Sequence, residues 1–147
     1  MEELSEYDQR RPFGLVLLTG LYLFFFLVSA STYGNPFPFL GKIYVGNVAK
    51  ALVFADCMFS LYLCLGIFKR QLLTWYLLLG YNLFEIVNVI INLSLITPAE
   101  LEKVIGVPVH QASLVMNNIV AALAILLLTQ YIFRHKDLFT CRDKYLF

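Results

Sequence analysis

Charged residues are scarce in this chain, making up 14% of its 147 residues. A soluble domain usually carries about 25%. Hydrophobic residues account for 60%, and the mean hydropathy is +0.74. This balance argues against an ordinary soluble domain and predicts a membrane protein whose first partner is the lipid bilayer. The net charge of +1 gives no reason to expect nucleic-acid binding.

Residues that commonly carry chemistry are also few: there are two histidines and three cysteines, with no Cys-x-x-Cys pair and no metal-ligand spacing. Cys57 and Cys64 lie seven residues apart in one apolar run, which predicts small packing residues on a shared helix face. Cys141 lies among basic residues, where palmitoylation and a free thiol both stay open and we favour the free thiol. A nucleophile–base pair, a metal-ligand set, a phosphate loop and a redox dithiol are all missing, which argues against an enzyme. We expect no metal and no cofactor.

Four apolar runs are each long enough to cross a bilayer as a helix. At this length we expect one domain, an all-α membrane protein with four transmembrane helices in an antiparallel bundle. The first run could be mistaken for a signal peptide, but its apolar core is too long and the acidic residues before it are wrong for one. The predicted spans are 13–32, 47–68, 72–96 and 112–133, between a cytoplasmic tail at 1–12 and a basic tail at 134–147.

The third span carries a polar stripe around which the other helices are expected to pack. Tyr81, Glu85, Asn88 and Asn92 follow one another at helical steps and therefore share one face, with Asn82 at its edge. Hydrocarbon offers no hydrogen bonds, so this stripe needs protein, water or a ligand beside it.

The second span places one more carboxyl group near this stripe. Asp56 lies in a row of small residues that would let another helix approach closely. The short turn at 69–71 makes the second and third spans antiparallel neighbours, with Asp56 and Glu85 at similar depth. We expect the two carboxyl groups within side-chain reach, at least one of them protonated when no cation is bound. The predicted intramembrane site is Asp56, Tyr81, Glu85, Asn88, Asn92, Asn117 and Asn118.

The two longer loops differ in character. Residues 33–46 contain glycine, proline and several aromatics, which predicts an irregular loop acting as an interfacial belt or as a lid. Residues 97–100 (Thr-Pro-Ala-Glu) form a capping box, and Gly106 is a stop signal. We therefore expect a short interfacial helix in the second outer loop.

The distribution of lysine and arginine predicts the orientation. With both termini inside, eight of these residues lie on the inner side and three on the outer side. The positive-inside rule then places both termini in the cytoplasm of a multi-pass protein, in the inner or plasma membrane if the source is prokaryotic.

Three short motifs carry a family resemblance: residues 11–14 (Arg-Pro-Phe-Gly), 65–70 (Leu-Gly-Ile-Phe-Lys-Arg) and 131–134 (Tyr-Ile-Phe-Arg). Together they resemble small four-pass prokaryotic membrane proteins that open with an R-P-x-G signature and have no assigned activity. The chain departs from that pattern in its aromatic first outer loop and in Asp56 and Glu85. The resemblance implies the four-span architecture and no catalytic residues.

Three functions stay open. The favoured hypothesis is an accessory or assembly subunit, in a homo-oligomer or larger membrane complex, whose polar seam holds helices together by hydrogen bonds. The alternative is a small proton- or cation-coupled transporter that uses Asp56 and Glu85. A membrane-embedded lipid-modifying enzyme is a further alternative. A cavity reaching both carboxyl groups would favour transport, and a tightly packed seam would favour the accessory role.

Overall fold

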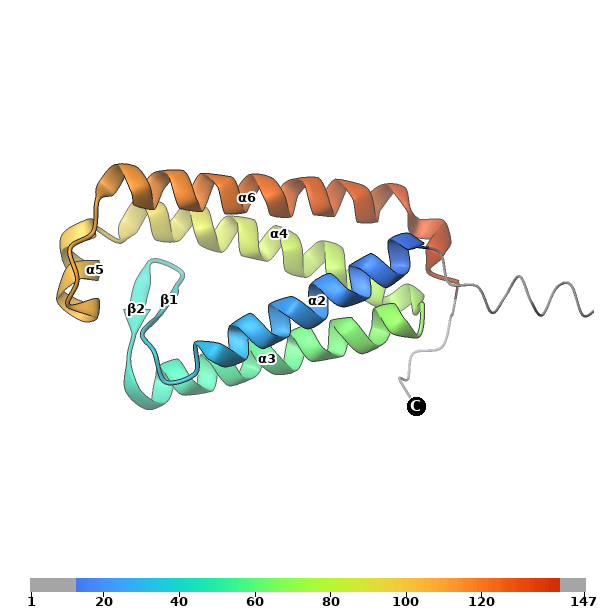
Figure 1. Cartoon of the computed structure of the whole chain (residues 1–147), viewed down its shortest axis with the longest axis horizontal. Coiled ribbons are helices and arrows are strands. Elements are labelled where there is room, and N and C mark those ends of the chain that lie inside the picture. Colours follow the sequence, from blue (N-terminus) through green and yellow to red (C-terminus); the bar gives the residue numbers. More distant parts are fainter. Residues whose placement is uncertain (1–12, 141–147) are drawn as a thin grey trace, which may run out of the picture.

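The computed structural model describes residues 13–140, and this part of the chain is mostly helical (Figure 1). Expectations for residues 1–12 and 141–147 lie outside the described residues. These include the cytoplasmic N-terminal tail, the Arg-Pro start of the family signature, Cys141 and the end of the basic C-terminal tail.

Four long helices dominate the structure: α2 (Phe13–Ser31), α3 (Gly46–Phe68), α4 (Leu72–Leu95) and α6 (Gln111–Arg134). Each is long and apolar enough to cross a membrane. Each also begins and ends within one residue of the corresponding predicted span. The prediction of a mainly helical, multi-pass membrane protein is thus supported by the length and composition of these helices.

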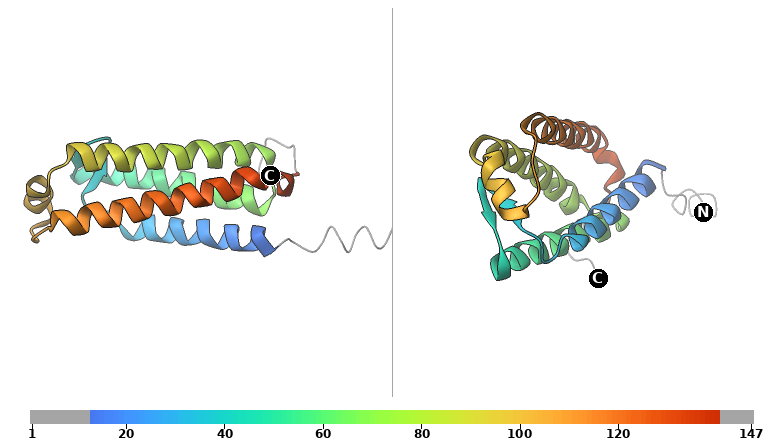
Figure 2. Two further views of the ribbon diagram at one scale, coloured as in Figure 1. Left: turned by 90° about the horizontal axis from the view of Figure 1, so that it is seen from above. Right: turned by 60° about the vertical axis from the view of Figure 1, so that its left-hand side comes forward.

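The helices pack mainly in two pairs, α2 along α3 and α4 along α6, while α3 and α4 touch much less (Figures 1 and 2). The turn between α3 and α4 brings their ends so close that a Cβ atom at Gly66 would overlap the Thr74 side chain. A similar close approach joins α2 to α6, where a Cβ atom at Gly14 would overlap the Tyr131 hydroxyl group. Two glycines therefore permit the tight packing at this end of the molecule.

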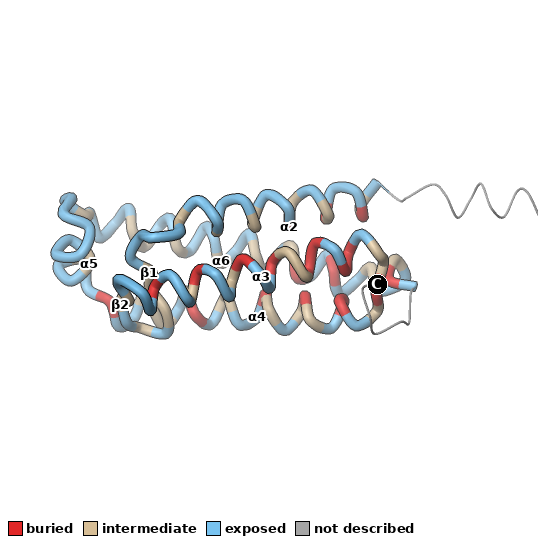
Figure 3. The backbone as a smooth tube through the Cα atoms, turned by 90° about the horizontal axis from the view of Figure 1, so that it is seen from below, coloured by how far each residue is buried: buried red, intermediate tan, exposed pale blue. Residues whose placement is uncertain are grey.

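We call this end the closed half: the start of α2, the end of α3, the start of α4 and the end of α6. Its apolar core includes Leu18, Leu63 and Leu78, and the polar side chains of Thr74 and Thr129 are buried beside it. The Trp75 indole N–H donates to the Ile132 carbonyl oxygen at 2.8 Å and so ties α4 to α6. Figure 3 shows buried positions gathered toward this end, whereas most of α6 is exposed.

The opposite end, the cavity half, is finished by short elements. Strands β1 (Phe37–Phe39) and β2 (Lys42–Tyr44) form an antiparallel hairpin in which Phe39 is paired with Lys42. The two residues between the strands, Leu40 and Gly41, both have positive φ, 47° and 85°. This is the backbone of a tight two-residue hairpin turn, so the expectation of a wholly irregular loop is wrong.

A short helix, α5 (Pro98–Ile105), follows α4. The Thr97 hydroxyl accepts from the Glu100 amide at 3.2 Å, and the Glu100 carboxylate accepts from the Thr97 amide at 3.1 Å. Gly106 ends the helix with φ of 73°. The predicted capping box and glycine stop are both confirmed. A single 3-10 turn, η1 (Lys136–Leu138), follows α6.

Candidate functional site

A cavity of about 780 Å³ lies between α2, α4 and α6, beginning where the closed core ends. Its walls are apolar, formed by side chains such as Phe25 and Val28 on α2 and Ile125 and Leu128 on α6. The cavity exists because α2 and α6 meet at the closed half and diverge toward the hairpin (Figure 1). Only Thr129 and Ile132 of α6 are buried, both near its C-terminal end.

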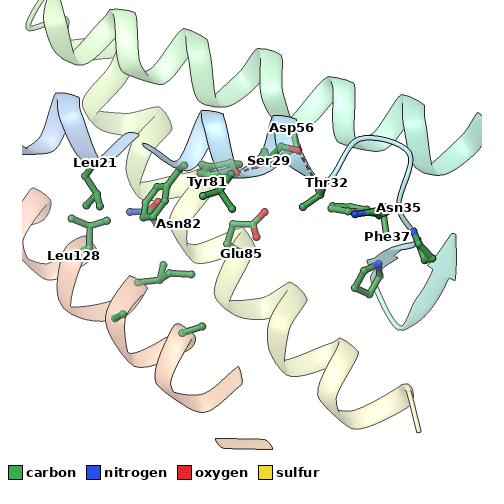
Figure 4. A pocket seen from close by; sticks show the side chains of 17 residues that line it. Leu21, Ser29, Thr32, Asn35, Phe37, Asp56, Tyr81, Asn82, Glu85 and Leu128 are labelled. Atoms are coloured by element: carbon green, nitrogen blue, oxygen red, sulfur yellow. Dashed lines mark hydrogen bonds between the residues drawn. The ribbon is translucent and has the colours of Figure 1, made fainter. Parts of the chain in front are cut away.

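Asp56 joins three helices at the polar side of this cavity. Its two carboxylate oxygens accept from different hydroxyl groups: from Tyr81 on α4 at 2.6 Å and from Ser29 on α2 at 2.7 Å. Asp56 is therefore held in place by neighbours from two other helices, as Figure 4 shows.

Glu85 follows Tyr81 by one helical turn and lines the same cavity as Asp56. Its side chain is half-buried, and Figure 4 shows it extending from α4 into the space between the helices. Among residues 13–140 we find no hydrogen bond to its carboxyl group, in contrast to Asp56. The structure thus brings the two predicted carboxyl groups to one cavity, one of them fixed and one facing open space.

Asn82 marks the boundary between the closed core and the cavity. Its side chain is 3% exposed, and its carbonyl oxygen accepts from the Tyr22 hydroxyl at 2.7 Å. Its amide nitrogen, Nδ2, is buried and has no hydrogen-bond partner among the described residues. A buried donor without a partner costs about 1–3 kcal/mol, so a hydrogen-bond acceptor placed beside Asn82 Nδ2 would be stabilising.

Asn88 and Asn92 lie one and two turns beyond Glu85, and their side chains bind the hairpin. The Leu40 amide donates to Asn88 Oδ1 at 2.8 Å, and the Gly41 amide donates to Asn92 Oδ1 at 2.7 Å. These bonds attach the hairpin turn to α4. Neither asparagine lines the cavity, so the outer half of the predicted stripe holds a loop in place.

The two asparagines of α6 also lie outside the cavity lining. Asn118 donates to the Leu114 carbonyl oxygen of its own helix at 2.8 Å, and Asn117 is exposed. Of the seven predicted site residues, Asp56, Tyr81 and Glu85 are brought together. Sequence reasoning missed Ser29 and Tyr22, because one hydroxyl in an apolar run gives no periodic signal.

A second cavity of about 510 Å³ lies on the other side of the same polar group, between α3 and α4. Asp56, Tyr81 and Glu85 line it too, with Leu52, Phe59 and Phe84 among its apolar walls. The three polar side chains therefore form a partition that is reached from two directions. No group of three or more metal-ligating side chains occurs within the described part of the chain.

Comparison with protein-family models, curated proteins and solved structures gives no match to this chain. The site's geometry is therefore the basis for assigning a function.

Proposed function

We propose that this protein is a small membrane carrier that binds a solute between α2, α4 and α6 and couples its binding to a proton or cation at Asp56 and Glu85. One observation carries the proposal: a cavity of about 780 Å³, framed by membrane-length helices, has both carboxyl groups in its lining. Small-molecule sites are typically about 300–1,000 Å³, mostly apolar, with a few convergent polar groups.

The cavity favours transport over the accessory role preferred from sequence. A seam that serves only to hold helices together needs its polar groups paired and packed. Asp56 satisfies this description, but Glu85 lies at the cavity without a hydrogen bond among the described residues, and the Asn82 amide has no partner there. Access to the polar partition from two cavities also suits a carrier, in which a ligand arrives by one route and leaves by another.

Assembly with another copy or a larger complex is a second candidate, supported by α6. Ser113, Asn117, Ala121 and Ala124 are all exposed, although they recur at steps of three and four residues on one helix face. An amide facing hydrocarbon is costly, and small residues permit close helix packing. A helix from another subunit would cover both features. Native mass spectrometry from mild detergent that shows only the mass of one chain would count against this candidate.

We further propose that the four long helices cross the membrane as an antiparallel bundle with both termini cytoplasmic and α5 at the outer interface. In support, this topology places eight lysine and arginine residues on the cytoplasmic side and three on the outer side. In addition, α2 starts at the end of the molecule where α6 finishes (Figure 1). Asn35→Cys and Glu102→Cys, in a chain without its native cysteines, should both react with an impermeant thiol reagent in intact cells. Protection of both, in a protein shown to be present, would contradict this topology.

The carrier proposal is tested first by binding. A dodecanol analogue with a diazirine on its chain serves as a neutral photoprobe for the protein in nanodiscs. We expect saturable cross-links at Phe25, Ile125 and Leu128, which line the cavity. Ala124→Trp should abolish them, because Ala124 lines the cavity, whereas Leu123→Trp, at a neighbouring 54% exposed position, should not. Unsaturable labelling spread over all exposed apolar surfaces would mean that no binding site exists.

A further inference from the structure

We infer that the ligand of this cavity is an amphiphilic organic cation that carries a hydrogen-bond acceptor close to its charged nitrogen. The inference rests on the proposed function and names its substrate class. Its cationic head would lie at Asp56 and Glu85, its acceptor at Asn82 Nδ2, and its apolar tail between α2 and α6.

The charge of the ligand follows from the lining. Asp56 and Glu85 both line the cavity, and none of the described residues around it is Lys, Arg or His. Two carboxyl groups in a medium of low dielectric constant need a proton or a cation between them. An anionic ligand would add to this repulsion, and a neutral one would leave its relief to a bound proton. A ligand cation removes it.

The walls indicate an organic cation. A bare Ca²⁺ ion takes about 6–8 oxygen ligands, and Mg²⁺ needs about six. The cavity offers two carboxyl groups and a few neutral polar side chains such as Thr32, and it is otherwise lined by apolar side chains, with Phe25 and Phe37 among its aromatics. Aromatic rings attract alkylammonium groups, and the volume of about 780 Å³ leaves room for an apolar body.

Asn82 gives independent evidence that the ligand carries a hydrogen-bond acceptor. Its Nδ2 atom is buried and has no partner among the described residues, and its side chain lines the cavity. Asn82 and Glu85 are three residues apart on α4, which places their Cβ atoms about 5–6 Å from each other. Because the two side chains start one helical turn apart and line the same cavity, a carbonyl or ether oxygen a few bonds from the cationic nitrogen would satisfy both groups in one ligand.

The route of entry makes the ligand an amphiphile. Val28 of α2 is 45% exposed, and Ala121 and Ala124 of α6 are exposed, yet all three line the cavity. The mouth therefore lies between α2 and α6, on a face that four membrane-length helices would turn toward lipid. A ligand that reaches the carboxyl groups from there must first partition into the bilayer.

The test uses the neutral photoprobe with four competitors that share one dodecyl tail: dodecanol, dodecanoate, dodecyltrimethylammonium and the dodecyl ester of trimethylglycine. We expect the quaternary ammonium to displace the probe about tenfold more effectively than dodecanol, and dodecanoate to be the weakest; tenfold corresponds to about 1.4 kcal/mol. The double variant Asp56→Asn with Glu85→Gln should abolish this preference while probe labelling persists, and Glu85→Gln alone should reduce it. Persisting labelling also shows that each variant is folded.

The acceptor is tested with the ester. We expect it to compete a few-fold better than dodecyltrimethylammonium, and Asn82→Leu to remove that advantage. Tyr22→Phe is the matched control, because it deletes the same Tyr22–Asn82 hydrogen bond but keeps the amide N–H. Equal competition by cation, alcohol and carboxylate would overturn the cation assignment and leave the carrier proposal standing. An ester advantage that survives Asn82→Leu would overturn the role of Asn82. Absence of saturable probe labelling in the unmodified protein would instead overturn the carrier proposal.

Discussion

The closed half and the cavity half are built from the same four helices, yet they differ in what fills the space between them. In the closed half, Leu18, Leu63 and Leu78 are at most 3% exposed and pack in one core. In the cavity half the helices diverge and leave a cavity of about 780 Å³, with side chains such as Phe25 and Leu128 in its walls. Rigid packing at one end thus supports a site at the other, an arrangement that lets a site open without loss of the fold.

The largest effect on stability is expected from a mutation in the core of the closed half. Leu78→Ala removes a side chain that is 0% exposed in the core, and should lower the free energy of unfolding by about 2–5 kcal/mol. The matched change is Leu83→Ala on the same helix, where the side chain is 52% exposed and the expected loss is below about 0.5 kcal/mol. Denaturant unfolding in mixed micelles measures both. Equal losses would show that the closed half is no better packed than the lipid-facing surface.

The attachment of the hairpin is the next target. Asn92→Leu deletes the acceptor for the Gly41 amide, and the combined change Asn88→Leu and Asn92→Leu also leaves the Leu40 amide without its acceptor. Each lost acceptor should cost about 1–3 kcal/mol of local stability. Amide exchange at residues 39–44 should accelerate while that of the closed half stays constant. Ser94→Ala is the control, because Ser94 is exposed and donates to the Ile90 carbonyl oxygen of its own helix. Exchange that accelerated equally in both halves would mean that the hairpin and the core unfold together.

A smaller effect is expected at α5. Thr97→Ala deletes the cap that accepts from the Glu100 amide and should cost about 1 kcal/mol. Faster amide exchange between Glu100 and Ile105 would show it, with the hairpin and the closed half unaffected. Unchanged exchange would indicate that something other than the cap holds this helix.

These regions also differ in how well sequence predicts them. Helix ends follow from apolar length and from local signals such as the Thr97 capping box, which need only neighbouring residues. The hairpin was missed because its turn is Leu-Gly, without the usual Asn-Gly or Asp-Gly signal, and because Pro38 is unfavourable in a paired strand. Its left-handed Leu40 is supported by Asn88, 48 residues away along the chain.

The site shows the same limit. Helical spacing correctly grouped Tyr81 and Glu85 on one face, and the short turn correctly indicated that Asp56 would be near. Helical spacing could not distinguish Asn88 and Asn92, which bind the hairpin, from Asn82, which lines the cavity. Periodicity identifies a shared face, but which partner each side chain meets along it depends on where α2 and α6 diverge. That divergence is a property of three-dimensional packing.

The smallest expected effect on stability falls on Glu85, one of the two carboxyl groups at the proposed coupling site. Glu85 has no hydrogen bond among the described residues, so Glu85→Gln should change the free energy of unfolding by less than about 0.5 kcal/mol. Asp56→Asn is the contrasting change, because an amide offers one acceptor where Asp56 uses two, and should cost about 1 kcal/mol. Proton movement across the proteoliposome membrane, driven by a solute gradient and measured with an internal pH dye, should fail for both variants, since each lacks one of the two carboxyl groups of the coupling site. If Glu85→Gln destabilised the protein as much as Asp56→Asn while transport continued, Glu85 would be a structural group and the cavity half would have no coupling carboxyl at that position.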